Sequence, residues 1–191
     1  MSTVAIVGGG PAGLSAGVFT SKNGLETVLF DTGETWMSKA HLFNYLGIGS
    51  IGGDEFMGVA RQQASDFGVA IHDDTAVSSV TATEDGFTLT TDDGEYEAEY
   101  VILATGADRS LAEELGCAMA DGVVDVDVSM ETSIEDAYAT GAMVRAEEWQ
   151  AVISAGDGAA AALNVLSKER GEHFHDFDVP ADAEAVFGGM D

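Results

Sequence analysis

The chain contains little of several residue types, and each scarcity narrows the choice of fold and function. It has one cysteine, Cys117, which excludes an intramolecular disulfide and a CxxC motif. No run of about 18 apolar residues occurs, so we expect no membrane-spanning helix. No basic, apolar leader precedes the first expected strand, so we do not expect export.

Basic residues are also scarce. Seven Lys and Arg face 34 Asp and Glu, which gives a formal net charge of −27. No basic patch can form to neutralise phosphates, so nucleic-acid binding is not expected. Such charge destabilises a compact state, and molar salt, with a screening length of about 3 Å, relieves the repulsion. We therefore expect a cytoplasmic protein of a salt-accumulating organism, the alternative being an ordinary acidic protein.

The start of the chain carries the strongest motif. With 191 residues, of which 46% are hydrophobic, the chain can form one domain with a real core. An apolar strand over residues 3–7 leads into a glycine-rich turn over residues 8–13. A helix over 11–23 follows, and then a second strand that ends at Asp31. This order of parts predicts a site for the pyrophosphate and ribose of a dinucleotide.

Each residue type in this motif has a physical reason. Gly8 allows the tight turn, Gly10 lets the backbone approach a diphosphate, and Gly13 lets the helix pack closely on the sheet. Pro11 suits the first turn of a helix, whose free N–H groups attract phosphate. Asp31 lies at the spacing at which an acid meets ribose hydroxyls, and it disfavours the 2′-phosphate of NADP. The expected ligand is FAD or NAD; the alternative is a glycine-rich turn that binds nothing.

The rest of the chain alternates between strand and helix patterns. Asp-Gly pairs separate three β-rich runs, as in an antiparallel meander. We therefore predict an α/β fold with a central, mostly parallel sheet and an inserted three-stranded antiparallel β-meander. The expected elements are a helix over 53–67, strands over 69–72, 77–83, 87–91, 95–100, 101–106, 123–128 and 138–141, and a last helix over 151–168.

Four stretches together resemble one family. Residues 8–16, 41–47, 103–107 and 130–158 are similar, in the same order, to the FAD domain of the thioredoxin reductase-like pyridine nucleotide-disulfide oxidoreductases. The resemblance implies a Rossmann-like FAD-binding domain with FAD as its cofactor. The FAD-binding residues that it implies are Gly8, Gly10, Pro11, Ala12, Gly13, Asp31, Thr32, His41, Asn44, Tyr45, Thr105, Gly106, Gly141, Ala142, Gln150, Ala151 and Val152.

The chain departs from the family pattern in two places. The family inserts an NADPH-binding domain, usually with the redox CxxC, after the Ala-Thr-Gly strand, whereas here residues 108–122 join the two halves directly. The expected layout is an N-terminal half over 1–107, that link, a C-terminal half over 123–170, and an acidic tail over 171–191. Ala142 stands where the family has an aspartate. One flavin hydrogen bond is therefore lost, worth about 0.5–1.5 kcal/mol, so FAD affinity falls about tenfold.

The resemblance suggests a function but no catalytic residue. It implies an FAD flavoprotein oxidoreductase that exchanges electrons with a separate redox partner protein or a small-molecule acceptor. The alternative is a non-catalytic flavin-binding module or a subunit of a larger redox complex; a third reading is an NAD-binding protein without flavin. Because the family often dimerises through its FAD domain, a homodimer is implied. The start of the last helix is expected to face the flavin with the positive end of its dipole.

Single residues leave alternatives open. Cys117 is either a small buried hydrophobe or a reactive thiol. His41 is either a hydrogen-bonded loop residue or a proton donor near the flavin, and Tyr45 either stacks near the flavin or fills core. Trp36 and Trp149 could cover the flavin face that the missing domain leaves open.

The tail from residue 171 is acidic, and we expect part of it to fray. His173 and His175 lie near Asp176 and Asp178 in this segment. A metal site needs convergent geometry, so a solvated cluster is the expectation and no metal is assigned.

Overall fold

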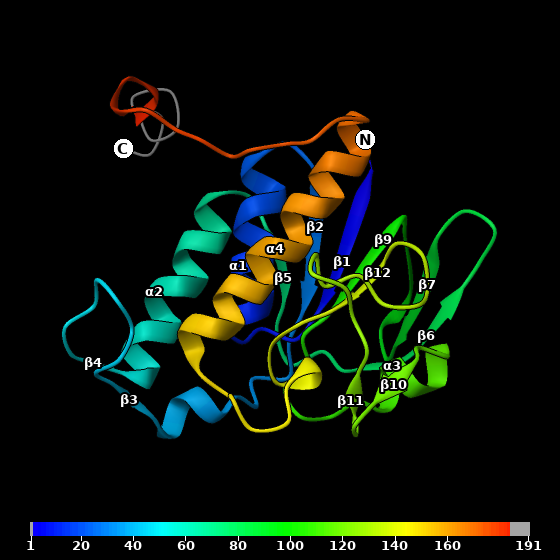
Figure 1. The fold of residues 1–191 in the computed structure, drawn as a ribbon, viewed down its shortest axis with the longest axis horizontal. Helices are drawn as coiled ribbons and strands as arrows, with labels where there is room; N and C mark the ends of the chain where they lie inside the picture. Colours follow the sequence, from blue (N-terminus) through cyan, green and yellow to red (C-terminus); the bar gives the residue numbers. More distant parts are fainter. Residues whose placement is uncertain (1, 184–191) are drawn as a thin grey trace.

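A five-stranded parallel sheet forms the centre of the molecule (Figure 1). The computed structural model describes residues 2–183. All four neighbouring pairs of the sheet are parallel, as the sequence predicts for most of them. In spatial order its strands are β12 (Ala137–Ala139), β9 (Tyr100–Leu103), β1 (Thr3–Val7), β2 (Glu26–Phe30) and β5 (Ala70–His72).

Three helices cover one face of this sheet (Figure 1). They are α1 (Pro11–Lys22), α2 (Gly53–Asp66) and α4 (Ala151–Arg170). Val4 and Ile6 of β1 point toward this layer and pack with Leu14 of α1 and Val165 of α4. Gly158 lets α4 cross α1 closely, because a Cβ there would collide with the carbonyl of Ala12.

An antiparallel meander covers the other face (Figure 1). It consists of β6 (Val77–Ala82), β7 (Phe87–Thr91) and β8 (Gly94–Ala98), paired in that order. Ala5 and Val7, which alternate with the helix-facing residues of β1, pack against the meander residues Phe87 and Leu89. The predicted α/β fold with an inserted meander is confirmed, and both faces of the parallel sheet are buried.

Shorter elements complete the fold. They are η1 (Trp36–Lys39), β3 (His41–Leu42), β4 (Ile51–Gly52), α3 (Ser110–Leu115), β10 (Met119–Ala120), β11 (Val123–Val124), η2 (Gly141–Val144) and η3 (Pro180–Asp182). The strand expected over 123–128 is wrong in its length, because β11 ends at Val124. The carboxylate of Asp127 accepts hydrogen bonds from the backbone N–H groups of Ser129 (2.8 Å) and Glu131 (3.0 Å). This local turn competes with a strand ladder.

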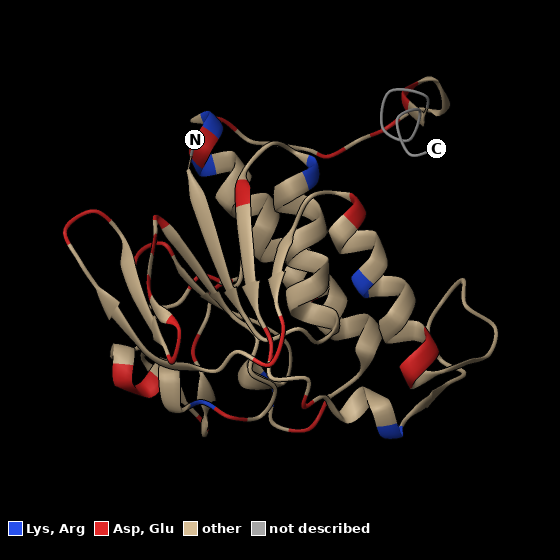
Figure 2. Cartoon of the chain, turned by 180° about the vertical axis from the view of Figure 1, so that it is seen from behind, with Lys and Arg blue, Asp and Glu red and all other residues tan. Residues whose placement is uncertain are grey.

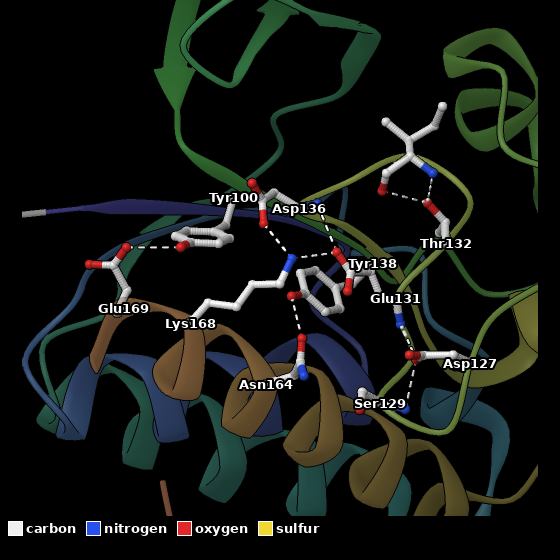
Figure 3. Close-up of polar contacts among 11 residues, drawn as sticks. Tyr100, Asp127, Ser129, Glu131, Thr132, Asp136, Tyr138, Asn164, Lys168 and Glu169 are labelled. Atoms are coloured by element: carbon white, nitrogen blue, oxygen red, sulfur yellow. Dashed lines mark hydrogen bonds and ion pairs between the residues drawn. The ribbon is translucent and has the colours of Figure 1, made fainter. Parts of the chain in front are cut away.

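A polar network ties the end of α4 to the sheet (Figure 3). Lys168 Nζ pairs with Glu131 at 2.5 Å and Asp136 at 2.6 Å. Tyr138, which is fully buried, donates its hydroxyl to Asn164 at 2.7 Å. These contacts lie around the amino ends of β9 and β12, away from the carboxyl ends where ligands bind in such sheets.

Part of the described tail contacts the ends of the helices, whereas most of its residues are exposed. Lys22 of α1 pairs with Asp176 at 2.9 Å and also with Asp178, and the Arg170 guanidinium lies 3.8 Å from the ring centre of Phe174. Residues 184–191 of the tail lie outside the described residues, and partial fraying of the tail stays a prediction. Between residues 2 and 183, no helix is long and apolar enough to cross a membrane.

Candidate functional site

A cleft of about 720 Å³ opens at the carboxyl ends of the parallel strands. Val7, Phe30, Ala104 and Thr140, at or just beyond the ends of β1, β2, β9 and β12, line it. This is the lower edge of the sheet in Figure 1. Ligands of open parallel α/β sheets bind at this edge, outside the strand ends.

The glycine turn forms one wall of the cleft. Gly8 has a φ of +112°, and a Cβ there would collide with the carbonyl of Ala104 on the neighbouring strand. A Cβ on Gly13 would collide with the carbonyl of Gly8, so both positions require glycine for packing. Gly10 differs, because the nearest atom to its would-be Cβ is Thr35 Oγ1 at 4.0 Å. The protein therefore leaves open space beside Gly10.

The amino end of α1 faces the same space. Pro11 occupies the first turn, and no side chain caps the helix at Gly10. The first turn also lacks an acidic residue. The first N–H groups of a helix have no intrahelical partner and attract phosphate, so this uncapped end fits a diphosphate.

Asp31 is held in place rather than free. Its Oδ1 accepts from the N–H groups of Gly9 and Gly33, each at 3.2 Å, and its Oδ2 accepts from Arg61 of α2 at 2.5 Å. Its side chain is 12% exposed and lines the cleft. A carboxylate offers about four acceptor positions, so Asp31 can still accept from a ribose hydroxyl. Sequence reasoning missed Arg61, since nothing in the pattern of α2 marks it.

The C-terminal half supplies the opposite wall through η2. Gly141 has a φ of +68°, and Gly141 and Ala142 both line the cleft. Arg109, from the link between the two halves, donates to the carbonyls of Met143 and Ala142, each at 2.9 Å, and to that of Arg145 at 3.3 Å. It also donates to the carbonyl of Ala107 at 3.0 Å. The link therefore holds the turn that borders the cleft.

The start of α4 meets the loop after β2 across the mouth of the cleft. The rings of Trp36 and Trp149 lie with their centres 5.1 Å apart. Asn44 donates its side-chain amide to Gln150, at the start of α4, over 2.7 Å. Trp149 donates its indole N–H to the carbonyl of Arg145 at 2.9 Å. Both tryptophans line the cleft, and their covering of a flavin face stays a prediction.

Most of the residues expected to bind FAD meet in this cleft. Those that line it are Gly8, Gly10, Pro11, Ala12, Asp31, Thr32, Thr105, Gly106, Gly141, Ala142, Gln150 and Ala151. Gly13, His41, Asn44, Tyr45 and Val152 do not line it. His41 Nε2 instead lies 2.9 Å from Ser50 Oγ, and the ring of Tyr45 lies 5.4 Å from that of Phe56.

Two groups of lining residues escaped the sequence analysis. Residues 75–78 at the start of β6 and Ser110, Leu111 and Glu114 of α3 line the cleft. The first group follows the carboxyl end of β5. Ligands bind beside such strand ends in parallel α/β sheets, so this position in the sequence is enough to predict that the group lines a site. The second lies on a short helix inside the predicted link, where the sequence shows no motif.

Cys117 belongs to the core and not to the cleft. It is 6% exposed and packs in the cluster beneath the meander. Burial raises the pKa of its thiol, although a contact with Thr132 Oγ1 at 3.6 Å opposes that shift. The structure thus supports the reading of Cys117 as a small buried hydrophobe.

Helices, parallel sheet and meander form three layers, and the cleft lies at the strand ends, where dinucleotides bind in α/β proteins. Residues 50–158 match the family model described as pyridine nucleotide-disulphide oxidoreductase, so the chain belongs to that family. FAD is the cofactor of this family, as the sequence predicts. The open space beside Gly10 and the uncapped end of α1 fit its diphosphate.

Two curated relatives match the chain in part. The thioredoxin reductase of Helicobacter pylori is 37% identical over 112 residues, which are 56% of this chain and 36% of that protein. The ferredoxin–NADP reductase of Levilactobacillus brevis is 29% identical over 110 residues, 54% of this chain and 33% of that protein. The chain thus spans about a third of the length of these relatives.

Solved structures share the fold. A thioredoxin reductase from Gloeobacter violaceus superposes with a TM-score of 0.83 at 20% identity, covering 93% of this chain and 99% of that one. A ferredoxin-flavin thioredoxin reductase from Clostridium acetobutylicum gives 0.78 at 19% identity, covering 90% and 99%. At such identities the likeness shows a common fold.

Proposed function

We propose that this chain is an FAD-dependent oxidoreductase in which residues 108–122 stand in place of an inserted NADPH-binding domain. In this layout residues 1–107 and 123–170 form one FAD domain, followed by the acidic tail. The observation that carries the proposal is the shared cleft, which the glycine turn of the first half and η2 of the second half line together. Arg109 of the link hydrogen-bonds the second wall.

The cleft suggests how the chain holds its cofactor. In this proposal the amino end of α1 would hold the diphosphate, Asp31 would accept from ribose hydroxyls, and η2 and the start of α4 would border the flavin. Ala142 offers no carboxylate, so the backbone of the turn that Arg109 holds contributes the contact there. FAD supplies the redox chemistry when bound, whereas the chain binds it, orients it and leaves the cleft mouth open.

Electrons pass to or from a separate partner in this proposal. Relatives carry the names thioredoxin reductase and ferredoxin–NADP reductase, which favours a disulfide protein or a ferredoxin-type protein; a small-molecule acceptor is the other candidate. Because Cys117 is buried in the core, any thiol chemistry belongs to the partner. We further propose a cytoplasmic protein of a salt-accumulating organism that forms a homodimer.

The test is FAD binding followed by electron transfer. We would purify the protein in molar KCl, add FAD, remove free flavin and photoreduce the complex without oxygen. Reoxidation by one of a panel of disulfides, quinones, ferredoxin and oxygen supports the oxidoreductase. Retained FAD that no acceptor reoxidises points instead to a flavin-binding module, and a protein that binds no FAD contradicts both.

A further inference from the structure

The two tryptophans of the chain meet at the mouth of the cleft. Trp36 comes from η1 and Trp149 precedes α4, so the pair joins the two halves of the chain. Their ring planes are tilted by 47°, and their centres lie 5.1 Å apart. Trp36 is 60% exposed and Trp149 is 41% exposed. Large exposed aromatic surface beside a cleft marks a binding surface more often than a packing one.

The pair is held in position although it is exposed. The Trp149 indole donates to the carbonyl of Arg145, and the Arg145 guanidinium pairs with the buried Asp157 through two contacts of 2.6 and 3.0 Å. Thr35 caps η1 by accepting from the N–H of Met37. Such fixed aromatic rings lose little conformational freedom when a ligand binds.

Acidic side chains line the cleft that the pair borders. The charged residues that line the cleft are all acidic: Asp31, Glu34, Asp108 and Glu114. Lys39 shares η1 with Trp36 but does not line the cleft. A neighbouring field of one sign repels ligands of that sign, and indole faces attract cations and stack with flat rings.

We propose that Trp36 and Trp149 form a binding site, beside the FAD, for a flat aromatic molecule that carries no negative charge. A neutral quinone and a cationic aromatic ring share this chemistry. The inference rests on the proposed function, because it names the class of small molecule that would exchange electrons at the open cleft.

Because the chain has two tryptophans, its tryptophan emission reports on this site alone. We would titrate FAD-free protein, at the lowest KCl concentration that keeps it folded, with menadione, methyl viologen and a naphthoquinone sulfonate. Saturable quenching by either of the first two is expected, with the sulfonate binding at least about tenfold more weakly, the equivalent of about 1.4 kcal/mol. Equal or tighter binding of the sulfonate contradicts the proposal.

Variants distinguish loss of the aromatic binding site from a general loss of folding. Equilibrium dialysis should show lost binding of the preferred ligand in Trp149→Leu and retained binding in Trp149→Phe, which keeps a ring. Phe177→Leu is the matched control, because Phe177 is 74% exposed but does not line the cleft. Unchanged binding in Trp149→Leu would overturn the proposal.

A last comparison separates this inference from the function on which it rests. Dialysis with FAD-loaded protein should show the ligand bound together with FAD. If the ligand displaces FAD, or if only a partner protein such as ferredoxin quenches the tryptophans, the inference is wrong while the flavoprotein remains. If the ligand binds but FAD never does, the proposed function fails and the aromatic site remains.

Discussion

At the residue scale, the glycines of the first turn divide into two kinds. Gly13 is required by the protein itself, because a side chain would enter the carbonyl of Gly8. Gly10 has ordinary backbone angles, φ −77° and ψ −175°, and free space beside it. The sequence motif assigns Gly13 to packing and Gly10 to the ligand, and the structure agrees, since it leaves no room for a side chain at Gly13 and open space beside Gly10.

This difference predicts opposite results for two alanine substitutions. Gly13→Ala should lower the free energy of unfolding by about 1–3 kcal/mol through overpacking. Gly10→Ala should change the free energy of unfolding by less than about 0.5 kcal/mol, yet weaken FAD binding. Urea unfolding of the FAD-free proteins and FAD titration measure the two effects. Equal destabilisation by both substitutions would contradict this division.

Cys117 gives a second prediction at this scale. Since burial raises the pKa of its thiol, the native protein should react with iodoacetamide far more slowly than the unfolded protein at pH 8 to 9. The folded pKa lies above the unfolded one, so this group favours folding below the unfolded pKa and loses that contribution as pH rises. Mass spectrometry with and without urea follows the alkylation. Rapid labelling of the native chain would show an accessible thiol.

At the scale of elements, residues 108–122 position one wall of the cleft. Arg109 holds η2 through carbonyls that would otherwise need other donors. Arg109→Met should cost about 1.5–3 kcal/mol of stability, in the range of hydrogen bonds to charged groups, and should also weaken FAD retention. Arg109→Lys is the control, since it keeps the charge but not the forked geometry. Thermal unfolding and FAD titration that match the wild type in Arg109→Met would refute this role.

The elements also show what the sequence can predict. The helix α1, the meander and the cleft wall follow from glycines, Asp-Gly turns and apolar runs that act locally. The helix α3 and the strand β10 did not follow, because residues 108–122 carry no periodic pattern long enough to show them. The partners of Asp31 and Ala142, Arg61 and Arg109, come from distant elements, and such tertiary contacts leave no mark on a single sequence.

At the scale of the whole molecule, the few basic residues serve internal contacts. Acidic residues occupy loops and element ends over the face that Figure 2 shows. Apart from Lys39, each of the seven Lys and Arg residues holds an ion pair, a set of carbonyls or an aromatic ring within residues 2–183. The surface is therefore left with uncompensated negative charge.

This charge predicts a strong dependence of stability on salt. The melting temperature should rise steadily between dilute buffer and molar KCl, because screening weakens the mutual repulsion of the carboxylates. Differential scanning fluorimetry over a KCl series measures it, and NaCl should act similarly if screening is the cause. A melting temperature that does not depend on salt would exclude the halophilic interpretation.

Alkaline pH tests the network around Lys168. Burial lowers the pKa of Lys168, but hydrogen bonds to Asp136 and Glu131 outweigh it, and the pKa lies above its usual 10.5. The stability from this pair is therefore present below pH 10.5 and is lost as pH rises through the folded pKa. Lys168→Met should be less stable at neutral pH and should lose less on going to high pH. If the stability of the two proteins falls by the same amount as pH rises, the network around Lys168 is not the source of the loss at high pH.

The link has one further consequence, for protein engineering. β9 and β12 are neighbours in parallel register, with Ala139 opposite Leu103, so the chain leaves the sheet at the carboxyl end of β9 and crosses over to re-enter it at the amino end of β12. A segment inserted between them lies outside the sheet, so it need not disturb the hydrogen bonds between β9 and β12. The part of residues 108–122 that follows Arg109 is thus a graft point, at which foreign modules with their own electron carriers could be fused to this scaffold.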